Sequence, residues 1–156
     1  MTEIQQYKEF IDKISEVKPG AIVVTIGAGD PEIFKYLSRE KQCRVFGVEL
    51  VELKERLPEV SIAVSNPFNS NYKALFPDLI GVDAVLNFLK DPIRNFRAFD
   101  VLVPLFTSGT RTLSVLELRE DQEQLILDFA ERIPLYNLKI EKGKGSLFVY
   151  GTYKGF

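Results

Sequence analysis

Two glycines and two acids are spaced in a way that suits binding of a nucleotide, with one acid placed to bind its ribose. Gly27 and Gly29 interrupt an apolar run and are followed directly by Asp30, while Glu49 ends the next apolar run. Glycines let a ligand approach the backbone, and a carboxylate roughly twenty residues later, at the end of a strand, can accept hydrogen bonds from both ribose hydroxyls. We therefore expect Gly27, Ala28, Gly29, Asp30 and Glu49 to contact such a ligand.

A loop after the third apolar run offers groups that suit a base. The ring of Phe68 could stack on the base, and the amides of Asn66 and Asn69 could read its edge. A plain polar turn, with the asparagines acting as turn residues, explains the loop equally well. Leu50, next to Glu49, completes the set of residues expected to bind the ligand.

Candidates for positioning a reacting group lie further along the chain. Asn87 could point its carbonyl at an amine, and Asp91 and Arg111 could hold an acceptor. Arg111 belongs to the segment Thr107 to Thr112, which we expect at the carboxyl edge of a strand, where open α/β sheets bind ligands. An ordinary solvated loop is the alternative for this segment. No residue presents itself as a catalytic base.

Apolar periodicity predicts helices and strands that alternate along the chain. The first helix is expected from Thr2 to Lys18, where Thr2 and Gln5 form a capping box. Apolar runs predict strands at 22–26, 43–50, 60–65, 81–88 and 99–106. Helices are expected between the strands, at 30–40, 51–57, 72–76 and 92–96.

The last third of the chain predicts a long helix and a hairpin. The helix is expected from Leu116 to Ile133, and strands at 135–141 and 146–153 flank a glycine-bearing turn, which makes them an antiparallel pair. Parallel strands joined by right-handed crossovers give an α/β three-layer sandwich, with a mostly parallel Rossmann-like sheet and a C-terminal antiparallel hairpin. Residues 1–156 are expected to form a single domain.

Composition excludes several classes of function. The chain has no histidine, which excludes a Ser-His-Asp triad and argues against a zinc site, so no metal is expected. A net charge of −2 gives no signal for nucleic acid, and no apolar run is long enough for a membrane span. Cys43 is the single cysteine, which suits a cytoplasmic protein without disulfides.

The terminal hairpin and the glycine turn together resemble the class I S-adenosylmethionine-dependent methyltransferases. The chain is also similar to small archaeal methyltransferase-like proteins in three segments: Gly27-Ala28-Gly29, the loop Asn66-Pro67-Phe68-Asn69, and Pro104-Leu105. The resemblance implies S-adenosylmethionine as the cofactor and methyl transfer that relies on proximity and orientation. Thr25, where the family usually has an acid, and Pro31, in place of the third glycine, depart from the family pattern.

Asp30 helps to choose between two kinds of ligand. Asp30-Pro31-Glu32 has the pattern of a helix start, with an N-cap acid and a proline at the first position. A carboxylate there would repel the pyrophosphate that a dinucleotide site places at this helix end. S-adenosylmethionine has no phosphate and carries an ammonium and a sulfonium, so the acid favours it over a dinucleotide. A plain helix cap explains Asp30 equally well.

Two functions follow from the resemblance. The first is a small methyltransferase of unknown acceptor, favoured because the glycine turn and Glu49 occur together. The second is a noncatalytic scaffold that acts through a protein partner or a homo-oligomer, as the departures at Thr25 and Pro31 suggest. The chain lacks an insertion for substrate recognition, so a large acceptor would need contacts from a second subunit, as in a homodimer.

Overall fold

The computed structural model describes residues 2–68, 71–120, 124, 127, 131 and 135–154. The predicted base contact Asn69 lies outside these residues. Within them, no helix combines the length and the apolar character needed to cross a bilayer.

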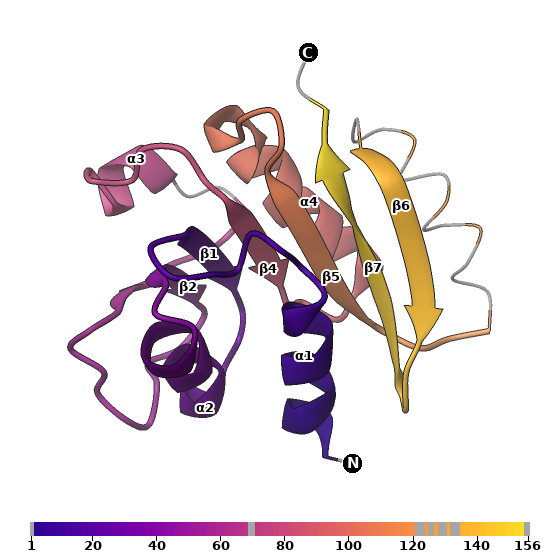
Figure 1. Ribbon diagram of the computed structural model, residues 1–156, viewed down its shortest axis with the longest axis horizontal. Coiled ribbons are helices and arrows are strands. Elements are labelled where there is room, and N and C mark those ends of the chain that lie inside the picture. The colour runs from indigo at the N-terminus through magenta and orange to yellow at the C-terminus, as the bar shows by residue number, and fades with distance from the viewer. Residues whose placement is uncertain are drawn as a thin grey trace.

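A seven-stranded sheet runs through the molecule in the order β3-β2-β1-β4-β5-β7-β6 (Figure 1). The first five strands pair in parallel, and β7 pairs antiparallel with both β5 and β6. The order reverses at β1, with β2 on one side and β4 on the other. The strands are β1 (Ile22–Ile26), β2 (Arg44–Glu49), β3 (Ser61–Val64), β4 (Ala84–Asn87), β5 (Arg111–Glu117), β6 (Leu135–Lys142) and β7 (Ser146–Tyr153).

Helices pack on both faces of the sheet, which confirms the expected three-layer α/β sandwich. Alternate residues of β1 point to opposite faces, so Val23 joins one apolar cluster and Val24 the other. The first cluster contains residues of α1 (Glu3–Asp12) and α2 (Pro31–Lys35), and the second contains residues of α3 (Tyr72–Leu75) and α4 (Pro92–Leu102). The mostly parallel sheet is thus buried on both faces.

The beginning of α1 follows the predicted capping box. The side chain of Thr2 accepts a hydrogen bond from the backbone N–H of Gln5, and the side chain of Gln5 accepts one from the backbone N–H of Thr2. The helix ends at Asp12, earlier than the predicted Lys18, and Ile14 and Val17 are buried beyond its end. The helix predicted at 30–40 is α2, continued by a π-helical turn at Tyr36–Glu40.

The predicted fifth strand, 99–106, is wrong. This segment forms the second half of α4 and a 3-10 turn at Val103–Leu105. Phe96, Phe99 and Leu102 recur at helical spacing and are buried, and Asp91 caps the helix. A continuous apolar run suits a buried strand or a buried helix, and here the Asp91-Pro92 start decides for the helix.

Two further expectations are corrected. The true fifth strand begins at Arg111 and includes Leu116, which was expected to start a long helix; most of the remainder of that predicted helix lies outside the described residues. The charged helix expected at 51–57 is absent from this described stretch, which forms bends and loops. Leu57 is its one buried residue, so a helix there would gain too little from packing.

Candidate functional site

The glycine turn joins β1 to α2 at the carboxyl edge of the sheet. Gly27 and Gly29 have φ angles of +65° and +71°, a conformation that strains other residues. A Cβ atom on Gly27 would lie 2.6 Å from Cδ2 of Leu89, whereas on Gly29 it would meet only the carbonyl oxygen of Gly27, at 4.0 Å. Gly29 therefore faces open space, where a ligand can approach the backbone.

Glu49, at the end of β2, reaches back to this turn. Its Oε2 accepts a hydrogen bond from the backbone N–H of Ala28 at 3.0 Å, and its Oε1 accepts one from Gly29 at 2.6 Å. The residue is 2% exposed. Burial raises the pKa of the Glu49 carboxyl, although the bonds from the turn act in the opposite direction. The structure thus joins the predicted acid and the predicted turn in one unit.

Asp30 caps α2 as its sequence pattern predicts. Its Oδ1 accepts a hydrogen bond from the backbone N–H of Glu32 at 2.9 Å, and Pro31 occupies the first turn.

The end of β3 lies next to the end of β2, because the backbone N–H of Ser65 donates to the carbonyl of Glu49 at 2.9 Å. The carboxyl ends of β1, β2 and β3 are therefore tied together.

The loop after β3 places two of its predicted residues near this edge. Asn66 accepts a hydrogen bond on Oδ1 from the backbone N–H of Phe68 at 2.9 Å, which forms a side-chain turn. Phe68 is half-buried and packs against the apolar cluster of α3 and α4. Leu50 is 54% exposed, so an apolar surface remains uncovered next to Glu49.

A hollow of about 310 Å³ opens between the glycine turn and α1. Lys90 donates a hydrogen bond to Oε1 of Glu3 at 2.6 Å, and the hydroxyl of Tyr7 donates to the same oxygen. These two bonds lower the pKa of Glu3, and burial together with Glu3 raises the pKa of Tyr7. The residues that line the hollow are Glu3, Ile4, Tyr7, Gly27, Ala28, Asp30, Phe88 and Lys90.

Sequence reasoning missed the contribution of α1 to this hollow. The helix was expected only to cover the sheet, and nothing local in the sequence tells where it docks. The spacing of Glu3 and Tyr7, four residues apart on one helix face, was the available signal.

Asn87 belongs to a buried polar network. Its Nδ2 donates to the carbonyl of Asn95 at 2.7 Å, and its Oδ1 accepts from the backbone N–H of Leu89 at 3.2 Å. Asn95 donates to the carbonyl of Leu89 at 2.9 Å and accepts from Ser114 at 2.8 Å. Asn87 is fully buried, and its amide bonds to α4 through Nδ2 and to the loop at Leu89 through Oδ1, so this geometry does not direct it to a methyl acceptor.

The remaining two candidates lie apart from one another. Asp91 is the N-cap of α4 and accepts from the backbone N–H of Arg94 at 3.1 Å. Arg111 pairs with Ala84 at the start of β4, so it lies at the amino edge of the parallel strands, opposite the glycine turn. The expectation that Thr107 to Thr112 follows a strand at the carboxyl edge is wrong, because this segment leads into β5, whose first two residues are Arg111 and Thr112.

Thr25, which replaces the family's usual acid, lies inside the sheet. It is fully buried beside Gly47, where an added Cβ would lie 3.0 Å from Oγ1 of Thr25 and 2.6 Å from Cε1 of Phe34. Within the described residues, Oγ1 of Thr25 has no hydrogen-bond partner. Thr25 therefore does not reach the hollow.

Comparison with solved structures shows which proteins share this fold. A ribosomal RNA methyltransferase from Plasmodium falciparum superposes with a TM-score of 0.72 over 96% of this chain and 95% of its own, at 12% identity. A TehB-like S-adenosylmethionine-dependent methyltransferase from Corynebacterium glutamicum gives 0.70 over 95% and 86%, at 17% identity.

A phosphoethanolamine N-methyltransferase from Haemonchus contortus, solved with S-adenosylhomocysteine, gives a TM-score of 0.67 at 15% identity. It matches 88% of this chain, which spans 38% of the length of that larger protein. No family model and no curated protein matches the chain. The chain therefore has the fold of the class I S-adenosylmethionine-dependent methyltransferases.

Proposed function

We propose that this protein binds S-adenosylmethionine at the carboxyl edge of β1, β2 and β4 and transfers its methyl group to an acceptor. One observation carries the proposal: the carboxylate of Glu49 is held against the backbone of Ala28 and Gly29, at the point where the strand order reverses. Open α/β sheets bind ligands at such a point. The shared fold of the methyltransferases supports it.

The described residues suit the nucleoside part of this cofactor. Each oxygen of Glu49 accepts one backbone N–H and keeps a lone pair for a ribose hydroxyl. Leu50 offers an uncovered apolar side chain for the adenine, and Asn66 and Phe68 follow β3 beside it. Asn69 is proposed to join them.

The hollow beside the glycine turn suits the amino-acid part of the cofactor. It carries charges of both signs, since Asp30 can attract an ammonium and Lys90 a carboxylate. Gly29 keeps a side chain out of the approach, and Gly27 lets Leu89 pack closely against the turn. When bound, the cofactor supplies an electrophilic methyl group, and the chain's own residues contribute by orienting it and excluding water.

Lys90 has a second part in this proposal. It donates to Glu3 from the segment after β4 and so holds the first turn of α1 over the hollow, whereas the bond from Tyr7 to Glu3 lies within α1 and fixes the carboxylate. Phe88 adds an apolar wall. An acceptor entering between α1 and the end of β4 is thereby enclosed on one side, and a large acceptor would need a second subunit on the other.

We also propose a cytoplasmic protein, since Cys43 is a free, buried thiol.

Calorimetric titration with S-adenosylhomocysteine tests the proposal. Wild-type protein is expected to bind with a micromolar Kd, and both Glu49→Ala and Gly29→Val to weaken binding at least a hundredfold. Gly20→Val is the matched control, because Gly20 also has a positive φ, +83°, with open space around it, but lies in the turn before β1. The proposal would be contradicted if Gly20→Val weakened binding as much as Gly29→Val does. It would also be contradicted if the wild-type protein bound no ligand at millimolar concentration.

A further inference from the structure

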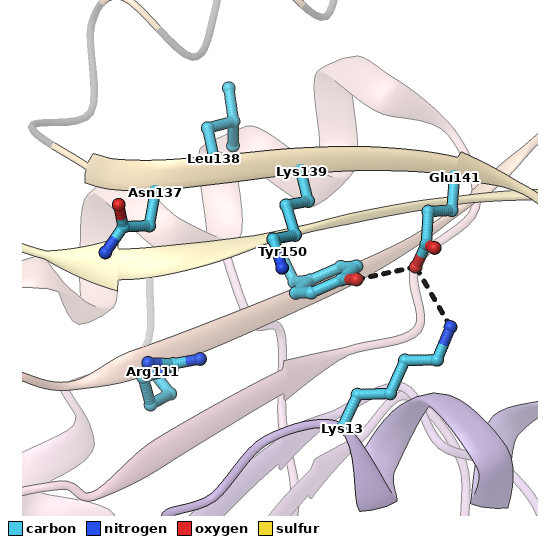
Figure 2. A pocket seen from close by; sticks show the side chains of 7 residues that line it. All are labelled: Lys13, Arg111, Asn137, Leu138, Lys139, Glu141 and Tyr150. Carbon is cyan, nitrogen blue, oxygen red and sulfur yellow. Dashed lines mark hydrogen bonds and ion pairs between the residues drawn. The ribbon is translucent and has the colours of Figure 1, made fainter.

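A second hollow, of about 690 Å³, lies on the sheet face beyond the C-terminal end of α1. Phe10 of α1 stacks on Phe148 of β7 with ring centroids 3.7 Å apart and thereby covers that row of the sheet. Tyr150, two residues further along β7, points to the same face; the residue is 7% exposed, and Phe10 packs edge-on against its ring with centroids 6.3 Å apart, while its hydroxyl side borders the hollow. Figure 2 shows the hollow with the side chains that surround it.

Three cations from three different elements converge on this hollow: Lys13 after α1, Arg111 of β5 and Lys139 of β6. Figure 2 shows Lys139 and Glu141 on the same side of β6, with Leu138 pointing away. The alternation is reset by a bulge between Tyr136 and Lys139. Bulges change the direction in which the following side chains point, and this bulge lies directly before Lys139, which faces the hollow.

Acids neutralise two of the three cations. Nζ of Lys13 lies 3.1 Å from Oε2 of Glu141, which also accepts a hydrogen bond from the hydroxyl of Tyr150 at 2.6 Å. Arg111 approaches Glu16 through Nε at 3.4 Å, longer than a strong charge-assisted bond. Among the described residues Lys139 has no ion pair within 4.0 Å, and its charge acts on Glu141 only through a longer-range attraction that helps to lower the pKa of that carboxyl. The hollow therefore has an excess positive charge in a chain whose net charge is −2.

We infer that this hollow is a binding site for a small phosphorylated molecule, separate from the cofactor site. A guanidinium offers paired donors that match two oxygens of a phosphate, and an ammonium adds a second point of charge. The volume leaves room for an organic group next to the phosphate. Lys13 and Glu3 lie at opposite ends of α1, about 15 Å apart along the helix, so both sites can be occupied together.

The test uses inorganic pyrophosphate, titrated at constant ionic strength and followed by backbone amide shifts. We expect saturable shifts at Arg111, Lys139 and Glu141, with no shifts at the glycine turn. The double variant Arg111→Gln, Lys139→Gln is expected to weaken binding at least tenfold. The matched control Lys144→Gln, an exposed lysine of the hairpin turn, is expected to stay within twofold of wild type.

A variant that is expected to bind pyrophosphate more tightly tests the inference independently of damage to the fold, because a damaged protein would lose affinity and not gain it. Glu141→Gln removes the acid that faces the phosphate while keeping an acceptor for Tyr150, so pyrophosphate is expected to bind more tightly by threefold or more. Shifts that do not saturate, equal affinity in the double variant, or binding of a single-stranded RNA oligonucleotide without binding of pyrophosphate would each overturn the inference. Failure of S-adenosylhomocysteine to bind would leave these results unchanged, because the two sites share no lining residue.

Discussion

Glu49 is a buried carboxylate, and it accepts hydrogen bonds from the backbone of the glycine turn, as buried polar groups generally do. Burial raises its pKa above the ordinary value of 4.5. Its proton is then bound more tightly in the folded chain than in the unfolded chain. The folded state therefore loses stability as the pH rises from 4.5 through the raised pKa.

Glu49→Gln tests this dependence on pH. Above the raised pKa the wild-type protein contains a buried charge that the variant lacks, so the unfolding free energy of the variant, relative to wild type, should increase as the pH rises from 4.5 and then level off. Urea denaturation at a series of pH values measures the difference. Glu52→Gln, in an exposed loop, corrects for the general effect of removing a charge. A difference that falls with pH would contradict the assigned burial.

Thr25 is a position where removal of a polar group is expected to stabilise the protein. Its hydroxyl is buried and has no partner among the described residues, so Thr25→Val should raise the unfolding free energy by about 1 kcal/mol. The same substitution at Thr110 removes a hydrogen bond of 2.6 Å to the carbonyl of Val82 and should lower it by about 1–3 kcal/mol. Equal destabilisation in both variants would show that Thr25 has a partner, such as a buried water.

Among the elements, the loop between β4 and α4 depends on Asn95. This fully buried side chain donates to the carbonyls of Asn87 and Leu89 and accepts from Ser114. Asn95→Ala removes these three bonds inside the protein and should lower the unfolding free energy by about 2–4 kcal/mol. Asn71→Ala, which removes one exposed capping bond, should cost about 1 kcal/mol. If urea denaturation gave Asn95→Ala and Asn71→Ala similar losses of unfolding free energy, the importance of the buried network would be contradicted.

Local signals predicted the segment from β1 to β2 well. The turn at Gly27 and Gly29 and the cap at Asp30 act within a few residues, so β1, β2 and the start of α2 follow from the sequence. The segment 99–106 failed because an apolar run does not distinguish a buried strand from a buried helix. That error moved β5 by a full element and placed Arg111 at the wrong edge of the sheet.

The docking of α1 was beyond local reasoning. Its apolar face predicted burial, but the partner of that face is β7, near the other end of the chain. The bond between Lys90 and Glu3 is likewise long-range. Residues brought together by the sheet order, rather than by spacing along the chain, form the hollow beside the glycine turn.

At the scale of the whole molecule, the sheet order is the feature that gives the site its place. Reversal of the order at β1 opens the carboxyl edge between β2 and β4, and β7 between β5 and β6 completes the fold of the class I methyltransferases. The two hollows then lie at opposite ends of α1, one next to the glycine turn and one over β6 and β7.

A crystal structure of the protein with S-adenosylhomocysteine tests the central claim most directly. The ligand is expected at the carboxyl edge, with its ribose hydroxyls on Glu49, its adenine on Leu50 and its amino-acid part in the hollow beside Gly29. Crystals of Glu49→Ala soaked in the same way should show no ligand there. Density for the ligand at another place on the chain, or an empty edge at millimolar ligand, would contradict the account.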